Sequence, residues 1–299
     1  LSAMRDERLV YLKKLGADGP VVIDTAQLDR RKPKSAEARR PRASFTQEGA
    51  RKLRLRFRKT GPAAFLSHLD LLRVIPRLFR RLELPLFYSQ GFHPKPEMVF
   101  GPALSLGVAS LCEHVDLKLV CDVELDGLAE RLTAQAPAGL VVESVVALGA
   151  HDATIAKLLA DGAVARYAVG LPRAAFADHG FADERAMWRE IEGQLEGGAL
   201  TVRRSIDGIG KTIRVRDYLV DVRREHGGDA LAIAGVVGDL ATLQVDVRLS
   251  AQGGVKIGEV VEALLGPEFP YRAVRAAMWT ARGVQRAMPT DLDAVAAEE

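Results

Sequence analysis

A chain of 299 residues with 48% hydrophobic and 27% charged residues has the composition of a folded globular protein, and it is long enough for two modest domains. No run of about 18 uncharged apolar residues is present, which argues against a membrane-spanning helix, and two cysteines, Cys112 and Cys121, cannot form a disulfide framework. Because no signal-peptide pattern is present either, we expect a cytoplasmic protein without a membrane partner. We predict no metal or other cofactor.

The net charge of +3 conceals one strongly basic segment. Residues 30–59 hold 13 of the 42 Lys and Arg residues but two of the 39 Asp and Glu residues, so the rest of the chain is acidic. Such a segment suits a phosphate-rich partner, because the counterions released from phosphates favour binding. It is equally typical of a solvated linker.

Residues 1–50 are predicted to be an N-terminal tail and a basic flexible linker. Leucines follow helical spacing between 9 and 15, and a short apolar run occupies 21–23. Residues 30–49 have almost no large apolar side chains, so burial cannot offset the entropy lost on ordering them. A first residue other than methionine fits a processed start or a piece of a longer polypeptide.

The next segment alternates basic and apolar side chains, as a strand with one buried and one solvated face does. Its apolar positions are Leu53, Leu55 and Phe57. If helices cover the apolar face, four cations point from the open face of the sheet, where other ferredoxin-like domains bind single-stranded RNA. We therefore predict a nucleic-acid-binding stripe that contacts phosphates, with a charge-protected edge strand as the alternative. The stripe comprises Lys52, Arg54, Arg56 and Arg58.

A helix follows, with apolar residues at helical spacing from 69 to 82 and arginines on its other side. Ser67 and Asp70 have the spacing of a capping box, and Pro76 is expected to kink or shorten the helix. The remaining patterns predict strands at 84–88, 115–119 and 140–148 and a helix at 125–132. The order β-α-β-β-α-β is that of a ferredoxin-like sandwich, which gives a predicted domain at 51–149.

A second α+β unit is predicted at 163–285, so the fold class is α+β throughout. A helix is expected at 184–195 and another at 257–265. Strands are expected at 167–171, 200–204, 219–223, 231–236 and 243–249. One interpretation is a diverged copy of the first domain, although no internal sequence repeat supports it.

Two short segments are candidates for a site. Ser67 precedes His68 and Asp70 at a helix start, which places an imidazole on the first helical turn. The loop that contains Gly91, His93 and Lys95 is stiffened by two prolines, and rigid loops hold binding groups well. The spacing of these histidines to His114 and to the cysteines matches no zinc pattern.

These segments belong to a specific combination of motifs, namely FLSHLDL at 65–71, YSQGFHPKP at 88–96, SLGV at 105–108 and EHVDL at 113–117. The combination resembles the radical SAM-linked (radical SAM-associated) proteins, a bacterial family of unknown function. The run KTIRVRDY at 211–218 is similar to a second signature of that family, except that Arg214 replaces its acidic residue. The resemblance covers the chain from about residue 51 to the end of the second unit.

The resemblance implies an accessory role beside a cobalamin-binding-type radical SAM protein, joined to it in cis or bound in trans. Our leading hypothesis is a non-catalytic module that binds or presents an RNA substrate, in which His68, Asp70, Gly91, His93 and Lys95 shape the site. A first alternative is a metal-independent endoribonuclease that uses His68 as its general base. A second is a protein-interaction module without nucleic acid.

Overall fold

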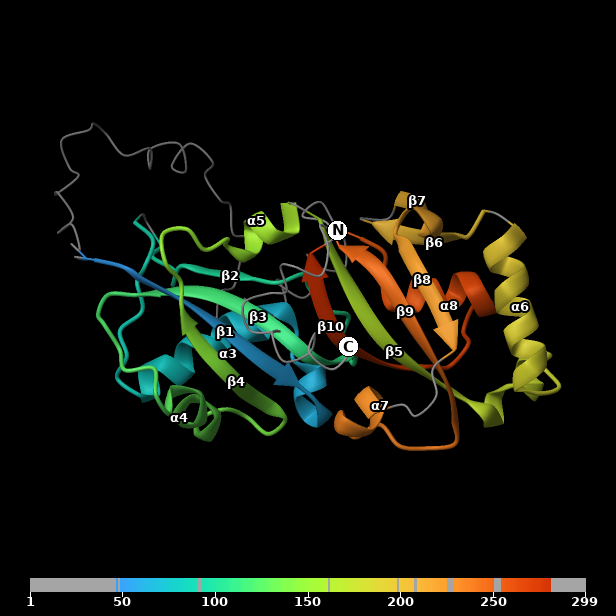
Figure 1. Cartoon of the computed structure of the whole chain (residues 1–299), viewed down its shortest axis with the longest axis horizontal. Coiled ribbons are helices and arrows are strands. Elements are labelled where there is room, and N and C mark those ends of the chain that lie inside the picture. Colours follow the sequence, from blue (N-terminus) through green and yellow to red (C-terminus); the bar gives the residue numbers. More distant parts are fainter. Residues whose placement is uncertain are drawn as a thin grey trace, which may run out of the picture. The chain divides into compact units, whose positions relative to one another are not determined.

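The computed structural model describes residues 47, 49–90, 93–160, 162–197, 199–206, 209–224, 229–249 and 254–280 (Figure 1). The chain divides into two units, Leu1–Thr46 and Gln47–Glu299, and all described residues belong to the second. The predicted N-terminal helix and strand lie outside the described residues, as do Gly91 and nearly all of the predicted linker.

The first half is built on a small antiparallel sheet in which β4 pairs with β1, β1 with β3, and β2 with β3. The predicted alternation in β1 is present, since Leu53, Leu55 and Phe57 are buried against helices α3 and α4. The elements are β1 (Arg51–Lys59), the 3-10 helix η3 (Gly61–Phe65), α3 (His68–Arg81), β2 (Met98–Phe100), β3 (Ala109–Leu119), α4 (Leu128–Ala134) and β4 (Leu140–Ala147).

Helix α3 begins with the predicted capping box. The Ser67 hydroxyl accepts a hydrogen bond from the Asp70 backbone N–H at 3.2 Å, and the Asp70 carboxylate accepts one from the Ser67 N–H at 2.9 Å. The helix continues through Pro76 to Arg81 without ending, so the proline does not shorten it.

The predicted strand at 84–88 is wrong. Within this segment Leu86 forms an isolated bridge with Leu119 and Tyr88 forms one with Pro96, while the strand between α3 and β3 is Met98–Phe100, which pairs with β3. The run contains Pro85, which has no N–H to donate to a ladder and therefore disfavours a regular strand.

The second half contributes another mainly antiparallel set of strands, in the order β10-β5-β9-β8, and a separate two-stranded hairpin, β6-β7. A short helix, α5 (Ile155–Ala160), connects the two halves. The elements are β5 (Ala163–Pro172), α6 (Glu184–Gly197), β6 (Thr201–Ile206), β7 (Ile209–Arg214), β8 (Leu219–Arg224), α7 (Asp229–Ile233), β9 (Leu240–Leu249), α8 (Ile257–Leu265) and β10 (Arg272–Thr280).

One prediction in this half is wrong. The segment 231–236, predicted as a strand, lies half in helix α7, which begins at Asp229 and is followed by Gly235 with φ of 76°. Its alanines favour a helix, and a left-handed glycine is a common helix end. Strands β7 and β10 were not predicted.

One eight-stranded sheet runs through both halves, because β3 and β10 pair in parallel at Ala109–Val274 and Ser110–Arg275 (Figure 1). The predicted mixed α+β class is confirmed, and the sheet is mainly antiparallel. Among the described residues, no helix is both long enough and apolar enough to cross a membrane.

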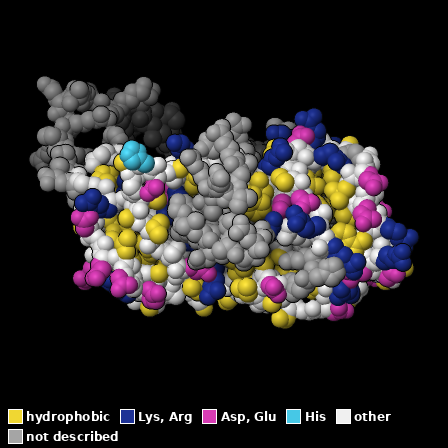
Figure 2. Space-filling model, viewed as in Figure 1, with side chains coloured by type: hydrophobic (Ala, Val, Ile, Leu, Met, Phe, Trp, Pro, Cys, Tyr) yellow, Lys and Arg dark blue, Asp and Glu magenta, His cyan; other side chains and the backbone are white. Residues whose placement is uncertain are grey.

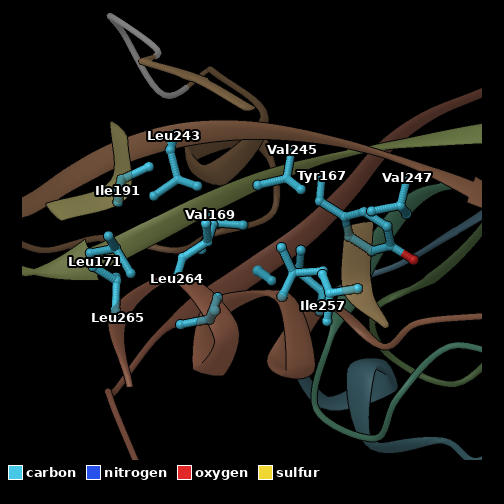
Figure 3. Packing of buried hydrophobic residues seen from close by; sticks show 14 of the residues in the cluster. Tyr167, Val169, Leu171, Ile191, Leu243, Val245, Val247, Ile257, Leu264 and Leu265 are labelled. Atoms are coloured by element: carbon cyan, nitrogen blue, oxygen red, sulfur yellow. The ribbon is translucent and has the colours of Figure 1, made fainter. Parts of the chain in front are cut away.

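The main helices cover one face of this sheet. Residues opposite each other on paired strands share a face, and the register joins Lys59 to Ser110, Ser110 to Arg275 and Arg275 to Tyr167. Lys59 donates to the Leu66 carbonyl, just before α3. Tyr167 lies with Val169 and Leu171 against α8, where Figure 3 shows Leu264 and Leu265. Helix α7 packs against Ala168 and Val274, on the opposite face.

Candidate functional site

A cavity of about 570 Å³ lies where the sheet forks. The edge of β3 pairs with β10 at residues 109–110 and with β2 at residues 115–117, so β2 and β10 diverge from the same edge. Cavities between two packed halves are common ligand sites, and this volume lies within their usual range. Its side-chain lining includes His68, Phe100, Ser105, Tyr167, Arg204 and Lys256.

His68 forms one wall of this cavity from the first turn of α3. Its ring is exposed and lies edge-on to Phe100, with the ring centroids 5.2 Å apart. Asp70 is engaged elsewhere, because its carboxylate accepts hydrogen bonds from the backbone and the hydroxyl of Ser67. These hydrogen bonds lower the pKa of Asp70, and they identify it as a helix cap.

The opposite wall comes from the second half of the chain. Arg204 on β6 donates to the Glu259 carboxylate at 2.6 Å and to the Gly254 carbonyl at 2.9 Å, which fixes the hairpin against the start of α8. Lys256, the residue before α8, is exposed at the cavity rim.

The charge of the cavity favours an anion. None of its described lining residues is acidic, and His68 and Lys256 are basic; Arg204 is basic as well, but Glu259 offsets its charge. The first turns of α3 and α8 both contribute, and a helix N-terminus carries a partial positive charge. The walls also include Phe100, Leu104 and Leu249, so an occupant with an anionic and an apolar part matches the lining.

A buried ionic cluster lies beneath the cavity. Arg275 is fully buried, donates to the Glu113 carboxylate, and donates to the Pro102 carbonyl at 3.1 and 3.2 Å. Burial alone would raise the pKa of Glu113, but Arg275 holds it below its usual value. Burial raises the pKa of Tyr167 and lowers that of Lys59. The cluster therefore ties β10 to β3 and to the cavity wall at Pro102.

The predicted basic stripe on β1 is largely neutralised. Arg54 is fully buried, and its guanidinium contacts the Asp116 carboxylate at 2.7 and 3.0 Å and the Ala153 carbonyl at 2.8 Å. The expectation that Arg54 projects into solvent is therefore wrong. Arg54 is buried because the segment leading into α5 covers this part of the sheet face. The Ile155 N–H at this segment also donates to the Asp116 carboxylate at 2.8 Å.

The other three cations of the stripe differ in exposure. Arg56 forms an ion pair with Glu143 at 3.2 Å, and Arg58 lies 3.9 Å from the same carboxylate. Lys52 is exposed and lines a second cavity of about 440 Å³ with Lys95 and Ser89. Of the predicted loop residues, Lys95 is thus brought to Lys52, whereas His93 is exposed and does not line either cavity.

The histidines and cysteines do not converge. Cys112 and His114 are buried in β3, Cys121 is half-buried beyond its end, and the part of the chain that the structure describes has no group of three or more His, Cys, Asp or Glu side chains suited to a metal ion. Cys112 belongs to the apolar core of the second half, where its sulfur lies 3.7 Å from the Arg275 carbonyl.

The β6-β7 hairpin is a basic surface that was not predicted from the sequence. Lys and Arg side chains gather over this hairpin in Figure 2, and its exposed cations include Arg203 and Lys211. The signal was available, because neither strand contains an acidic residue, but the segment around Gly210 reads as a turn.

The fold and site define an α+β protein with one mainly antiparallel sheet and a basic cavity at the fork of that sheet. Residues 52–256 match the model of a family described as "Uncharacterized protein conserved in bacteria" (DUF2344), and the chain belongs to this family. The match extends from β1 to the residue before α8 and so includes most of the cavity lining. A search of curated proteins finds no match to the chain.

Proposed function

We propose that the chain is a non-catalytic accessory module of a radical SAM system that binds an RNA substrate through the cavity at the sheet fork. The observation that carries the RNA-binding part is the charge of this cavity, whose described lining has basic residues from both halves and no acid. The radical SAM partner, in cis or in trans, rests on the motif resemblance. RNA would meet the exposed cations Lys256, Arg203 and Lys211.

The chemistry of the lining suits a nucleotide. Phosphate oxygens prefer basic side chains and helix N-termini, and unstacked bases prefer aromatic and apolar walls. His68 and Phe100 provide the aromatic surface on one side, and Lys256 provides a cation on the other. Lys52 and Lys95 at the second cavity would extend the phosphate contacts.

We also propose that the chain is a tandem of two ferredoxin-like units. The strand orders β4-β1-β3-β2 and β10-β5-β9-β8 each support this, with one helix after the first strand and one after the third. The β6-β7 hairpin would then be an insertion in the second unit.

The test is RNA binding measured by fluorescence anisotropy over a series of salt concentrations. Each phosphate contact contributes about 0.7 to the slope of log affinity against log salt for single strands, so the pair Lys211→Ala and Lys256→Ala should lower the slope by about 1.4. Arg131→Ala on α4 is the matched control, since Arg131 is exposed but lies on another element and lines neither cavity. An unchanged slope in the double variant would refute the assignment.

The endoribonuclease alternative is favoured by one observation, the exposed His68 ring at the cavity wall. A general base contributes roughly 10²- to 10⁴-fold to the rate, so under this alternative His68→Ala abolishes cleavage of labelled RNA in chelator. Our proposal expects no cleavage by the wild-type chain. Metal-independent cleavage that only the His68 variant loses would replace the accessory function with the enzymatic one.

A further inference from the structure

An apolar patch is exposed at the start of α3. Phe65, Leu69 and Leu106 are 67%, 64% and 65% exposed, and Leu72 is 37% exposed. Single exposed apolar residues are ordinary, but a contiguous group of this size usually marks an interaction surface.

The patch is contiguous because two loops meet there. The Gly107 N–H donates to the Ala64 carbonyl at 3.1 Å, and a Cβ on Gly107 would lie 3.5 Å from the Phe65 ring. Leu106 is therefore held beside Phe65. Phe65 is the last residue of η3, three residues before His68 begins α3, and Leu69 and Leu72 are three residues apart on one side of α3.

The rest of the exposed face of α3 is positive. Arg73, Arg77 and Arg80 are exposed, and within the described residues no ion pair joins Arg77 or Arg80 to an acid. Asp70, the helix's one acidic residue, is occupied by its capping hydrogen bonds. The surface thus changes from apolar in the first turns to cationic in the later turns.

We propose that this surface docks an amphipathic helix of a partner protein, with apolar anchors at one end and carboxylates at the other. Charge complementarity selects an acidic occupant, and the aliphatic part of the surface selects one that also carries apolar side chains. Leu69 and Leu72 have the i, i+3 spacing of one helix face, and helices pack against each other through such faces. The proposal is independent of RNA binding at the cavity.

The test uses a fluorescent peptide of about 15 residues, near the length at which isolated helices become stable, with leucines in its first turns and glutamates in its last. A peptide of the same composition in scrambled order is the control. We expect the full chain to bind the designed peptide at least about tenfold more tightly, which corresponds to about 1.4 kcal/mol. Binding should weaken with salt, because part of it is electrostatic.

Two pairs of substitutions distinguish the apolar contribution to peptide binding from the electrostatic one. Leu69→Ser with Leu106→Ser removes the anchors, and Arg77→Glu with Arg80→Glu reverses the charge; each pair should reduce peptide affinity at least about tenfold. All four side chains are exposed, so folding should persist, which circular dichroism checks. Val220→Ser, at an exposed valine of β8, and the pair Lys211→Ala and Lys256→Ala should leave peptide binding unchanged.

Three results would overturn the proposal. The first is equal affinity for the designed and scrambled peptides. The second is a loss of RNA affinity in the Leu69 and Leu106 variant as large as that in the cavity variant, which would assign the patch to RNA. The third is a wild-type dimer in sedimentation that the same variant converts to a monomer, which would make a second copy the occupant.

Discussion

Arg54 and Lys52 are two residues apart on β1, but Arg54 is buried and Lys52 is exposed. Substitutions at the two positions should therefore change the free energy of unfolding by different amounts. Arg54→Met leaves the Asp116 carboxylate buried without its partner, and breaking a buried pair in this way costs about 3–5 kcal/mol. Lys52→Ala, at an exposed side chain, should change the free energy of unfolding by no more than about 0.5 kcal/mol. Urea titration of both variants measures the difference, and equal losses would contradict the buried pair.

His114 makes stability depend on pH. Burial, reinforced by Arg56 and Arg54 and opposed by Glu113, lowers the pKa of His114 from 6.5 to about 3. In the unfolded chain His114 takes up a proton below about pH 6.5, whereas in the folded chain it does so near 3, so stability falls as the pH falls between these values. The expected loss at pH 5 is about 2 kcal/mol relative to pH 7.5.

The check compares urea denaturation of the wild type and His114→Gln at pH 7.5 and pH 5. Carboxylates contribute equally to both proteins, so the variant should show the smaller loss on acidification. A pH dependence identical in the two proteins would show that His114 does not carry the effect.

At the residue scale, local patterns were predictable and distant pairings were not. The capping box depends on Ser67 and Asp70 alone, three positions apart, and it is present as predicted. The burial of Arg54 depends on Asp116 and on Ala153, 62 and 99 residues away, which no local pattern reveals. The RNA contacts of the stripe stay a prediction, with Lys52 as its most accessible member.

At the element scale, one glycine fixes how β4 approaches the start of η3. Gly139 has φ of 87°, and a Cβ there would lie 2.1 Å from the Thr60 carbonyl oxygen. The Thr60 N–H also donates a hydrogen bond to the Gly139 carbonyl at 2.8 Å. Gly139→Ala should therefore cost at least about 2 kcal/mol, through strain and displacement of this turn. Gly127→Ala, also at positive φ but with open space around it, is the control for strain alone. Similar losses in the two variants would exclude the clash.

The elements that sequence patterns predicted well are those with strong periodicity. The alternation in β1 and in β9 and the helical spacing in α3 and α8 are local properties, and all four elements are present. Strand β10 was not predicted because Arg272–Thr280 contains three alanines and two arginines, a composition with weak strand preference. Its position is set by partners, since Arg275 pairs with Glu113, 162 residues earlier.

At the scale of the whole molecule, the halves should unfold together. Strand β10 belongs to the second half by its pairing with β5, yet it also pairs with β3 and supplies Arg275 to Glu113 of the first half. Calorimetry of the full chain should show one main transition for this sheet. Two well-separated transitions would contradict the coupling.

A fragment of residues 51–149 provides the matching experiment. It contains the first predicted domain but lacks β10, so Glu113 loses its partner Arg275 and the β3 edge at Ala109–Ser110 is uncovered. We expect it to be at least about 3 kcal/mol less stable than the first half within the full chain, because breaking a buried ion pair costs about that much. Native-like stability of the monomeric fragment by urea denaturation would argue for two independent domains.

The central position of β10 also has a consequence for synthesis on the ribosome. Every other strand of the sheet leaves the exit tunnel before β10 does, so the nascent chain holds two incomplete sheets, each with an unpaired edge, until β10 has emerged. Contacts that join residues 165 positions apart, such as Ser110 and Arg275, form slowly. During that interval the open edge of β3 is the segment most prone to pair with another nascent chain, and it is there that a chaperone would be needed.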